Sequence, residues 1–271
     1  MSARKGTVLV GCVAYHPRIV TIWEGFLPYF AERGLRTDYV LYSNYERLVD
    51  ALLSEAVDIA WNTNTAYVAA EERIGGDAQV LGMRDVDADF RTVIAARRED
   101  APADARSLAG GRLALGSRDS GHAAILPLHY LAREGLDAAS ECDLVRFDTD
   151  LGKHGDTGDS ELRVLRAVRE GEADAGALGD ATWARLRTES PENTEGLEVF
   201  WRSPTYYHCN FTALPSFERG RLWTEALLGM SYDDLLVRAE MELEGVKRWL
   251  PGDKSGYADL TEAMRQQGYL G

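Results

Sequence analysis

Short apolar runs alternate with amphipathic stretches along the first ninety residues, and this alternation constrains the fold more than any other feature of the sequence. The apolar runs have the length of a buried strand, and the stretches between them carry apolar side chains at helical spacing. Strands that alternate with helices in this way form βαβ units around a parallel sheet. We expect strands at residues 7–14, 37–42 and 57–61 and helices at residues 19–33, 45–54 and 66–72.

The same alternation starts again near residue 110, after an acidic loop that contains proline. It predicts strands at residues 112–116, 142–147 and 173–178 and helices at 122–133, 160–169 and 181–186. Later helices are expected at 219–228, 232–244 and 257–267, with a turn at 249–252 between the last two. Apolar runs at 90–96 and 209–214 are candidates for crossing between lobes. We therefore expect an α/β fold of two lobes with mixed, mostly parallel sheets and helices on both faces. Lobe one takes residues 1–92 and 210–271, and lobe two takes residues 93–209.

Composition narrows the class of protein. The chain has 271 residues, of which 45% are hydrophobic, so it can bury a sizeable core. Its 44 acidic and 30 basic residues give a net charge of −14, which disfavours a nucleic-acid partner or an anionic membrane surface. No apolar run approaches the roughly 20 residues that span a bilayer. Cys12, Cys142 and Cys209 show no CxxC spacing, so no disulfide framework is expected.

The start of the chain bears on its compartment. The first predicted strand begins almost at once, and no long apolar region with a small-residue cleavage site precedes it. We expect a cytoplasmic protein on the sequence as it stands, and a periplasmic or extracellular one if a leader was trimmed.

A polar turn between residues 110 and 131 is the first candidate ligand site. Asp119, Ser120, Gly121 and His122 lie between a predicted strand and a predicted helix. The start of a helix presents backbone N–H groups without intrahelical partners and a partial positive charge, so this turn can receive an anionic group. The alternative is that Asp119 or Ser120 only caps the helix.

Polar and aromatic side chains also follow predicted strands of lobe one. Tyr15 and His16 follow the first strand, and Asn62, Thr63 and Asn64 follow the third. Ligands of open α/β sheets bind at the carboxyl ends of strands. We therefore expect these five residues to contact the ligand.

The second crossing run is preceded by Tyr207 and His208, which we also expect at the ligand site. Tyr207 serves equally well as a core residue. We predict no cofactor and no metal. The alternative is a transition metal held by His16, His122 and His208, although no HxxxH, HxH or CxxC spacing supports it.

Nucleophilic catalysis is a further alternative. It would pair Cys209 or Ser120 with His208 or His122, but no GxSxG motif is present.

Three stretches of the chain together resemble a known family. They are YSNYERLVDALLSEAVDIAWNTNTAYV at residues 42–68, SLAGGRLALGSRDSGHAAILPLHYL at 107–131 and SELRVLRAVREGEADAGAL at 160–178. In order and spacing they resemble the phosphate, phosphite and phosphonate substrate-binding family of ABC transporters, which has the type 2 periplasmic-binding-protein fold. The resemblance implies a Venus-flytrap protein with its ligand in a cleft between the lobes. It also implies an ABC permease as partner, and a phosphonate group bound at Ser120 and Gly121 beside Asp119.

The sequence departs from the family pattern at two positions. Asp119 adds a carboxylate where the family often has hydroxyl side chains, and Glu161 stands where many relatives have a histidine. The exchange at Glu161 replaces a donor by an acceptor and favours a ligand with an amine or hydroxyl group. Together with the expectation of a cytoplasmic protein, this exchange leaves an alternative function: a cytosolic enzyme on the same fold, with or without a metal.

Overall fold

Residues 6–271 are described by a computed structural model, in which the chain forms two compact units. The first unit runs to Asp89 and resumes over Tyr207–Ala258, and the second comprises Phe90–Tyr206 and Asp259–Gly271. Both crossings lie three residues earlier than the predicted boundaries. Residues 1–5, which the prediction assigned to lobe one, lie outside the described residues.

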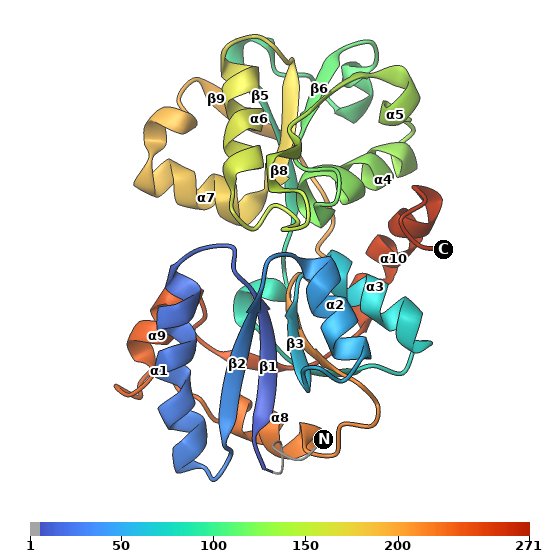
Figure 1. Cartoon of the computed structure of the whole chain (residues 1–271). Coiled ribbons are helices and arrows are strands. Elements are labelled where there is room, and N and C mark those ends of the chain that lie inside the picture. The colour runs from blue at the N-terminus through green and yellow to red at the C-terminus, as the bar shows by residue number, and fades with distance from the viewer. Residues whose placement is uncertain (1–5) are drawn as a thin grey trace. The chain divides into compact units, whose positions relative to one another are not determined.

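The first unit is built on a sheet of six strands in the order β11-β4-β10-β3-β1-β2. Figure 1 shows β1 between β2 and β3 in this sheet. Strand β1 pairs in parallel with β2 and β3, and β10 runs antiparallel to β3 and β4. The predicted mixed sheet is thus confirmed in this unit, with two parallel strand pairings and three antiparallel ones, including that of β11 with β4. The strands are β1 (Val8–Val13), β2 (Thr37–Tyr42), β3 (Ile59–Asn62), β4 (Gln79–Arg84), β10 (Asn210–Ala213) and β11 (Trp249–Pro251).

Helices cover both faces of this sheet because the side chains of β1 alternate between them. Val8, Val10 and Cys12 join a core with α1, α8 and α9, whereas Val13 packs with α2 and α3. The helices are α1 (Arg18–Glu32), α2 (Tyr45–Leu53), α3 (Asn64–Ile74), α8 (Gly220–Leu228) and α9 (Arg238–Glu244).

The second unit has a sheet of five strands in the order β7-β6-β8-β5-β9. Strand β6 pairs in parallel with β7 and β8, and β5 is antiparallel to β8 and β9. The strands are β5 (Thr92–Arg97), β6 (Arg112–Leu115), β7 (Asp143–Arg146), β8 (Ala175–Gly179) and β9 (Leu197–Arg202). The helices are α4 (Leu126–Arg133), α5 (Ala138–Glu141), α6 (Asp159–Arg169), α7 (Asp180–Glu189) and α10 (Ala258–Gln266). Short 3₁₀ turns occur in both units. Those of the first unit are Asp85–Asp87 and Ser255–Tyr257, and those of the second are Arg98–Asp100, Ala105–Leu108, Asp148–Asp150 and Pro191–Asn193.

The C-terminal segment from Asp259 onward packs with the second unit, whereas the prediction placed all of residues 210–271 in lobe one. The Asp259 carboxylate accepts hydrogen bonds from Tyr130 Oη at 2.9 Å and Arg133 Nη1 at 2.9 Å. Gln267 Nε2 donates to the carbonyl of Ile125 at 2.9 Å. These contacts attach α10 to α4, and no local pattern in the sequence announces them.

Two local predictions differ from the structure. Residues 249–252 were expected to form a turn, but Trp249–Pro251 forms β11 and pairs antiparallel with β4. Pro251 is tolerated there because β11 is an edge strand. The helix expected at 232–244 begins only at Arg238, since the Asp234 side chain accepts the backbone N–H of Leu236 at 2.9 Å in a local turn. Among residues 6–271, none of the helices has both the length and the apolar character to cross a bilayer.

Candidate functional site

The turn after β6 opens a helix, but its first turn is not α-helical. Residues Gly121–Ile125 form a π-helical turn, and α4 begins at Leu126. Pro127 has no N–H to donate to the carbonyl of Ala123, and that carbonyl accepts the Gly116 N–H at 3.0 Å instead. The backbone N–H of Ile125 accordingly reaches back five residues to the carbonyl of Ser120 at 3.0 Å. Turns of this kind occur frequently at functional sites.

Ser120 caps this turn and is fully buried. Its Oγ accepts the Ala123 N–H at 3.2 Å, so the capping alternative holds for Ser120. Asp119 has a different role, because its carboxylate accepts the Gly152 N–H at 2.5 Å and lies 3.9 Å from His154 Nε2. Asp119 therefore holds the loop that precedes α6.

That loop lies directly on the Ser120 turn. Gly155 has a φ of +89°, and a Cβ added to it would lie 3.0 Å from Ser120 Oγ and 3.2 Å from His122 Nε2. Only glycine combines this backbone conformation with such close approach. The Asp150 carboxylate anchors the same loop by accepting the Ser160 N–H at 3.0 Å at the start of α6.

His122 and Glu161 form a buried pair next to this turn. His122 Nε2 lies 3.5 Å from Glu161 Oε1, and the two side chains are 5% and 2% exposed. Burial by itself lowers the pKa of His122, but attraction to the Glu161 carboxylate outweighs it and holds that pKa above its usual value. Burial likewise raises the pKa of Glu161, and His122 together with hydrogen bonds outweighs it and brings the pKa below its usual range. Each partner thus favours the charged form of the other, an imidazolium beside a carboxylate.

Both oxygens of Glu161 are already engaged within the second unit. Oε1 accepts the Gly179 N–H at 2.7 Å, and Oε2 accepts from Thr182 Oγ1 at 2.9 Å. Glu161 thus fixes the charge and orientation of His122. A contact between Glu161 and an amine or hydroxyl of a ligand stays a prediction.

We expect Glu161→Gln to lower the pKa of His122, because the amide keeps the burial and removes the attracting charge. NMR titration of the His122 imidazole measures this directly. A raised histidine pKa adds stability that is full below the unfolded value of 6.5 and is lost as pH rises through the folded pKa. The wild-type protein should therefore lose this contribution above that folded pKa, and the variant should not.

The matched control for this titration is Glu170→Gln, which removes an exposed carboxylate paired with Arg166 at the end of the same helix. It should leave the pKa of His122 unchanged. An unchanged His122 pKa in Glu161→Gln would contradict the assignment of the pair.

Ser160 is a buried polar residue of the second unit that the sequence reasoning did not single out. Its Oγ has no hydrogen-bond partner among residues 6–271 and would lie 3.2 Å from a Cβ added to Gly116. Buried hydroxyl groups are normally satisfied by protein, water or ligand. The sequence offered one signal for Ser160: it is the first residue of the third stretch that resembles the family, residues 160–178.

In the first unit, the residues after β3 are buried as a group. Thr63 caps α3 by accepting the Ala66 N–H at 3.4 Å, and Asn64 Oδ1 accepts the Thr65 N–H at 2.8 Å. Asn62 Oδ1 is buried without a hydrogen-bond partner in the described part of the chain. The start of α3 therefore resembles the Ser120 turn, with a hydroxyl cap beside a buried polar group.

A network of polar side chains continues from Asn62 into the core. Asn62 Nδ2 lies 3.1 Å from Thr212 Oγ1, which lies 2.6 Å from Asn210 Oδ1. Asn210 Nδ2 in turn donates to Tyr257 Oη at 2.8 Å. Sequence reasoning missed this network, although Asn210 and Thr212 alternate with apolar residues along a predicted buried strand.

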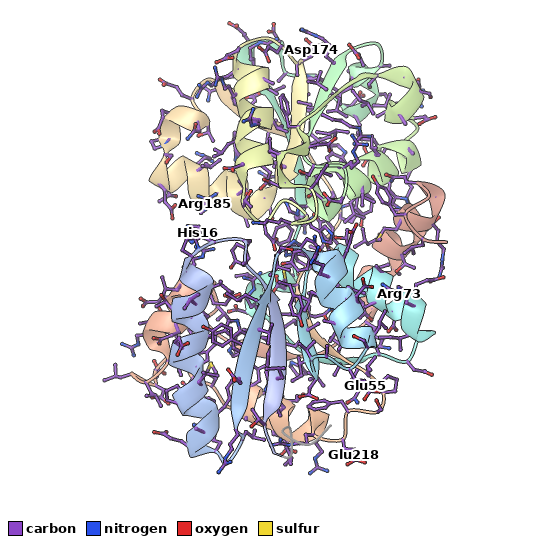
Figure 2. All side chains as sticks on the ribbon, viewed as in Figure 1. His16, Glu55, Arg73, Asp174, Arg185 and Glu218 are labelled. Carbon is purple, nitrogen blue, oxygen red and sulfur yellow. The ribbon has the colours of Figure 1, made fainter. Side chains whose placement is uncertain are left out.

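The remaining predicted residues of the first unit differ in exposure. His16 is exposed, and its Nδ1 accepts the Arg18 N–H at 3.2 Å at the start of α1 (Figure 2). Tyr15 is half-buried and packs against the core of this unit. Tyr207 donates from Oη to Asp253 Oδ2 at 2.9 Å, and its carbonyl lies 3.5 Å from Asn64 Nδ2.

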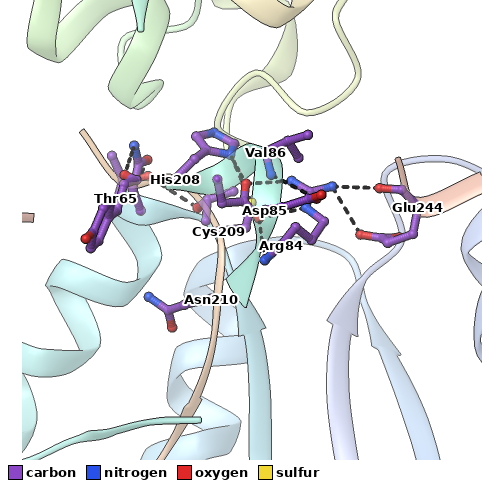
Figure 3. Close-up of polar contacts among 12 residues, drawn as sticks. Thr65, Arg84, Asp85, Val86, His208, Cys209, Asn210 and Glu244 are labelled. Carbon is purple, nitrogen blue, oxygen red and sulfur yellow. Dashed lines mark hydrogen bonds and ion pairs between the residues drawn. The ribbon is translucent and has the colours of Figure 1, made fainter. Parts of the chain in front are cut away.

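His208 is buried next to Cys209, as Figure 3 shows, and it also lies close to Asp87. Its Nδ1 lies 3.4 Å from Asp87 Oδ1 and 3.0 Å from Cys209 Sγ. In a catalytic triad the nucleophile and the carboxylate contact opposite nitrogens of the histidine ring. Here both contact Nδ1 of His208, so the geometry does not support Cys209 as a nucleophile activated through His208. Of the side-chain groups in residues 6–271 that could hold a metal, none contains His16 or His122.

Two cavities lie away from the predicted residues. One of about 500 Å³ is lined by Glu55, Asp58, Glu218 and Arg219 at the start of β1. Another of about 560 Å³ follows α6 past Arg163 and Arg166. Neither cavity includes the polar turn at Ser120 or the one at residues 62–64. Those two turns, at the carboxyl ends of strands, carry the hydrogen-bond donors that favour a small anion.

Residues 13–257 match the family described as the periplasmic substrate-binding proteins of phosphonate ABC transporters. The probable ABC transporter phosphite-binding protein PhnD1 of Prochlorococcus marinus (strain MIT 9301) is 22% identical over 240 residues, which cover 84% of this chain and 77% of that protein. The match supports the predicted binding protein and not the alternative of an enzyme on the same fold.

Solved structures show the same fold at low sequence identity. PhnD1 in complex with methylphosphonate has a TM-score of 0.75 at 19% identity, with 97% of this chain and 98% of that chain covered. XAC2383 of Xanthomonas citri bound to ATP has a TM-score of 0.76 at 18% identity, with 98% and 99% covered. The aliphatic sulphonate-binding protein SsuA of Escherichia coli has a TM-score of 0.67 at 14% identity, with 97% and 93% covered. The predicted type 2 periplasmic-binding-protein fold is thereby confirmed.

Proposed function

The chain belongs to the family of periplasmic substrate-binding proteins of phosphonate ABC transporters, and we propose that it binds a small organic anion with a phosphonate, sulfonate or carboxylate group. The observation that carries this proposal is the family match over residues 13–257, which includes both polar turns described above. The predicted cleft between the lobes stays a prediction.

The Ser120 turn supplies the donors that such an anion needs. The chain carries a net charge of −14, so an anion must be held by local groups and not by the overall field. The N–H groups that open the helix of Gly121–Ile125 supply partial positive charge, and the His122 imidazolium adds a full one. Ser160 Oγ, buried without a protein partner in residues 6–271, offers a further hydrogen bond.

The first unit carries its own set of polar groups at the end of β3. Thr63 and Asn64 open α3, and Asn62 Oδ1 is a buried acceptor without a partner in the described residues. An acceptor suits a ligand hydroxyl or amine better than a bare oxyanion. We therefore favour an organic anion over inorganic phosphate.

The relatives set the ligand classes to test. PhnD1 is named for phosphite and was solved with methylphosphonate, SsuA is named for aliphatic sulphonates, and XAC2383 was solved with ATP. Each of these ligands carries a tetrahedral or phosphoryl oxyanion. The proposal extends to delivery of the ligand to an ABC permease outside the cytoplasmic membrane, as the family description implies.

We expect at least one member of an anion panel to raise the melting temperature of the protein. The panel contains methylphosphonate, 2-aminoethylphosphonate, phosphite, methanesulfonate, acetate, ATP and inorganic phosphate. A ligand at about 100 times its Kd stabilises the folded state by about 2.7 kcal/mol, which a thermal melt detects as a shift of several degrees. Isothermal titration then gives the Kd, and the absence of binding by every member would overturn the proposal.

A further inference from the structure

Three buried side chains that bind transition metals meet in the first unit, at Asp87, His208 and Cys209 (Figure 3). Each contributes one candidate ligand atom, and the three atoms all lie within 4.8 Å of one another. Their residues are 0%, 6% and 5% exposed. Carboxylate and thiol both approach the same nitrogen, Nδ1 of His208, so the three atoms converge on one point.

The spacing of these atoms is close to that of a tetrahedral zinc site. Zinc binds nitrogen and oxygen at about 2.0–2.1 Å and sulfur at about 2.3 Å, which places neighbouring N and O ligands about 3.3–3.4 Å apart and N and S ligands about 3.5 Å apart. His208 Nδ1 lies 3.4 Å from Asp87 Oδ1, at the spacing a metal needs. It lies 3.0 Å from Cys209 Sγ, so binding needs a widening of about half an ångström.

Backbone and side-chain contacts hold the ligands in place. The His208 N–H donates to the Asp87 carbonyl at 2.9 Å, which fixes the two segments against each other. Arg84 donates to the Asp87 carboxylate from Nε at 2.7 Å and Nη2 at 2.8 Å. Partners of this kind orient a ligating carboxylate in metal sites.

The charges around the three residues favour a divalent cation. Arg84 also reaches Glu244 Oε1 at 3.2 Å, and Glu244 is buried. Two buried carboxyl groups, those of Asp87 and Glu244, thus face the one Arg84 guanidinium beside the three ligand atoms, and carboxylate groups attract a bound cation.

We propose that Asp87, His208 and Cys209 form a binding site for a divalent transition metal of the zinc class, completed by a water molecule. A thiolate with an imidazole selects zinc or cobalt over magnesium and calcium, which prefer oxygen ligands alone. The Cys209 thiol releases its proton when the metal–sulfur bond forms, and no electron is transferred. The site is independent of the anion that the protein binds.

Cobalt is the probe that tests this site. The full chain, stripped with a chelator and dialysed, is titrated with Co²⁺ and followed by absorption. We expect one Co²⁺ per chain, a near-ultraviolet thiolate-to-cobalt charge-transfer band, release of one proton from the thiol below its pKa, and displacement of the band by Zn²⁺. A wild-type protein that gives no such band overturns the proposal.

Variants locate the site. Cys209→Ser should remove the charge-transfer band and weaken Co²⁺ binding by more than about a hundredfold, since loss of an outer partner alone costs 10–100-fold. The control is Cys142→Ser, which removes a half-buried thiol of the second unit and should leave the band unchanged. A band that persists in Cys209→Ser overturns the proposal. Proton release by the wild-type protein provides a measurement that does not depend on how well a variant folds.

Discussion

Replacing Ser120 by aspartate is expected to abolish binding of the anion while the protein stays folded. The new carboxylate would lie at the start of the Gly121–Ile125 turn, where the anion is proposed to bind. Two like charges about 4 Å apart repel by about 4 kcal/mol at an effective dielectric constant of about 20, which corresponds to roughly a thousandfold loss of affinity. Isothermal titration with the best ligand of the panel measures the loss.

Ser120→Asn is the matched control. Asparagine has the size of aspartate and caps a helix as well as serine does, but it carries no charge. Any steric cost against the Gly155 backbone is therefore shared by the two variants. Equal affinity of the two variants for the anion would move the site away from Ser120.

The largest expected loss of stability follows from Arg84→Met. Arg84 pairs with Asp87 and Glu244, whose side chains are 0% and 2% exposed. Removing one partner of a buried ion pair leaves uncompensated charge and costs about 3–5 kcal/mol. We expect the midpoint of unfolding to fall by roughly 10 °C in a thermal melt.

An exposed pair provides the control for that variant. Arg73 and Asp50 lie 2.8 Å apart with side chains 53% and 65% exposed, and Figure 2 shows Arg73 on α3. Such pairs contribute about 0–1 kcal/mol, so Arg73→Met should change the melting temperature by little. A similar small effect of Arg84→Met would contradict the stabilising role of the buried network.

Acid should weaken the same network. Burial by itself raises the pKa of Asp87, but attraction to Arg84 outweighs it and brings that pKa well below its usual value. A carboxyl group with a lowered pKa adds stability that is present above its unfolded value and is lost as pH falls through the folded one. This contribution should therefore survive at pH 5 and disappear only in strong acid.

Local sequence patterns predict where the helix after Ser120 starts, but they do not predict the form of its first turn. The polar residues between an apolar strand and a helix predicted a helix start near His122, and the structure has a helical turn there. The π-helical form of that turn consists of bonds that reach back five residues, from the Ile125 N–H to the Ser120 carbonyl and from the Leu126 N–H to the Gly121 carbonyl. Helical periodicity does not report such a contact.

Glu161 illustrates the same limit for the site. The sequence presents it as an acceptor near the ligand, because family order places it there. Both of its oxygens are taken by Gly179 and Thr182, and His122 lies beside it. The partners of a buried carboxylate are set by packing between elements, which the sequence does not display.

The sequence by itself determined the α/β class, the two-lobe alternation and the position of the polar turns, because strand and helix periodicity and turn residues act over a few neighbouring positions. The family followed from the resemblance of three stretches of the chain, at residues 42–68, 107–131 and 160–178. Only the tertiary structure decided that α10 packs with the second unit, that His122 pairs with Glu161 and that His208 meets Asp87. Asp87 and His208 stand on either side of the whole segment Phe90–Tyr206. Contacts across such separations are made by the packing of the complete sheet, and burial then decides which charges must pair.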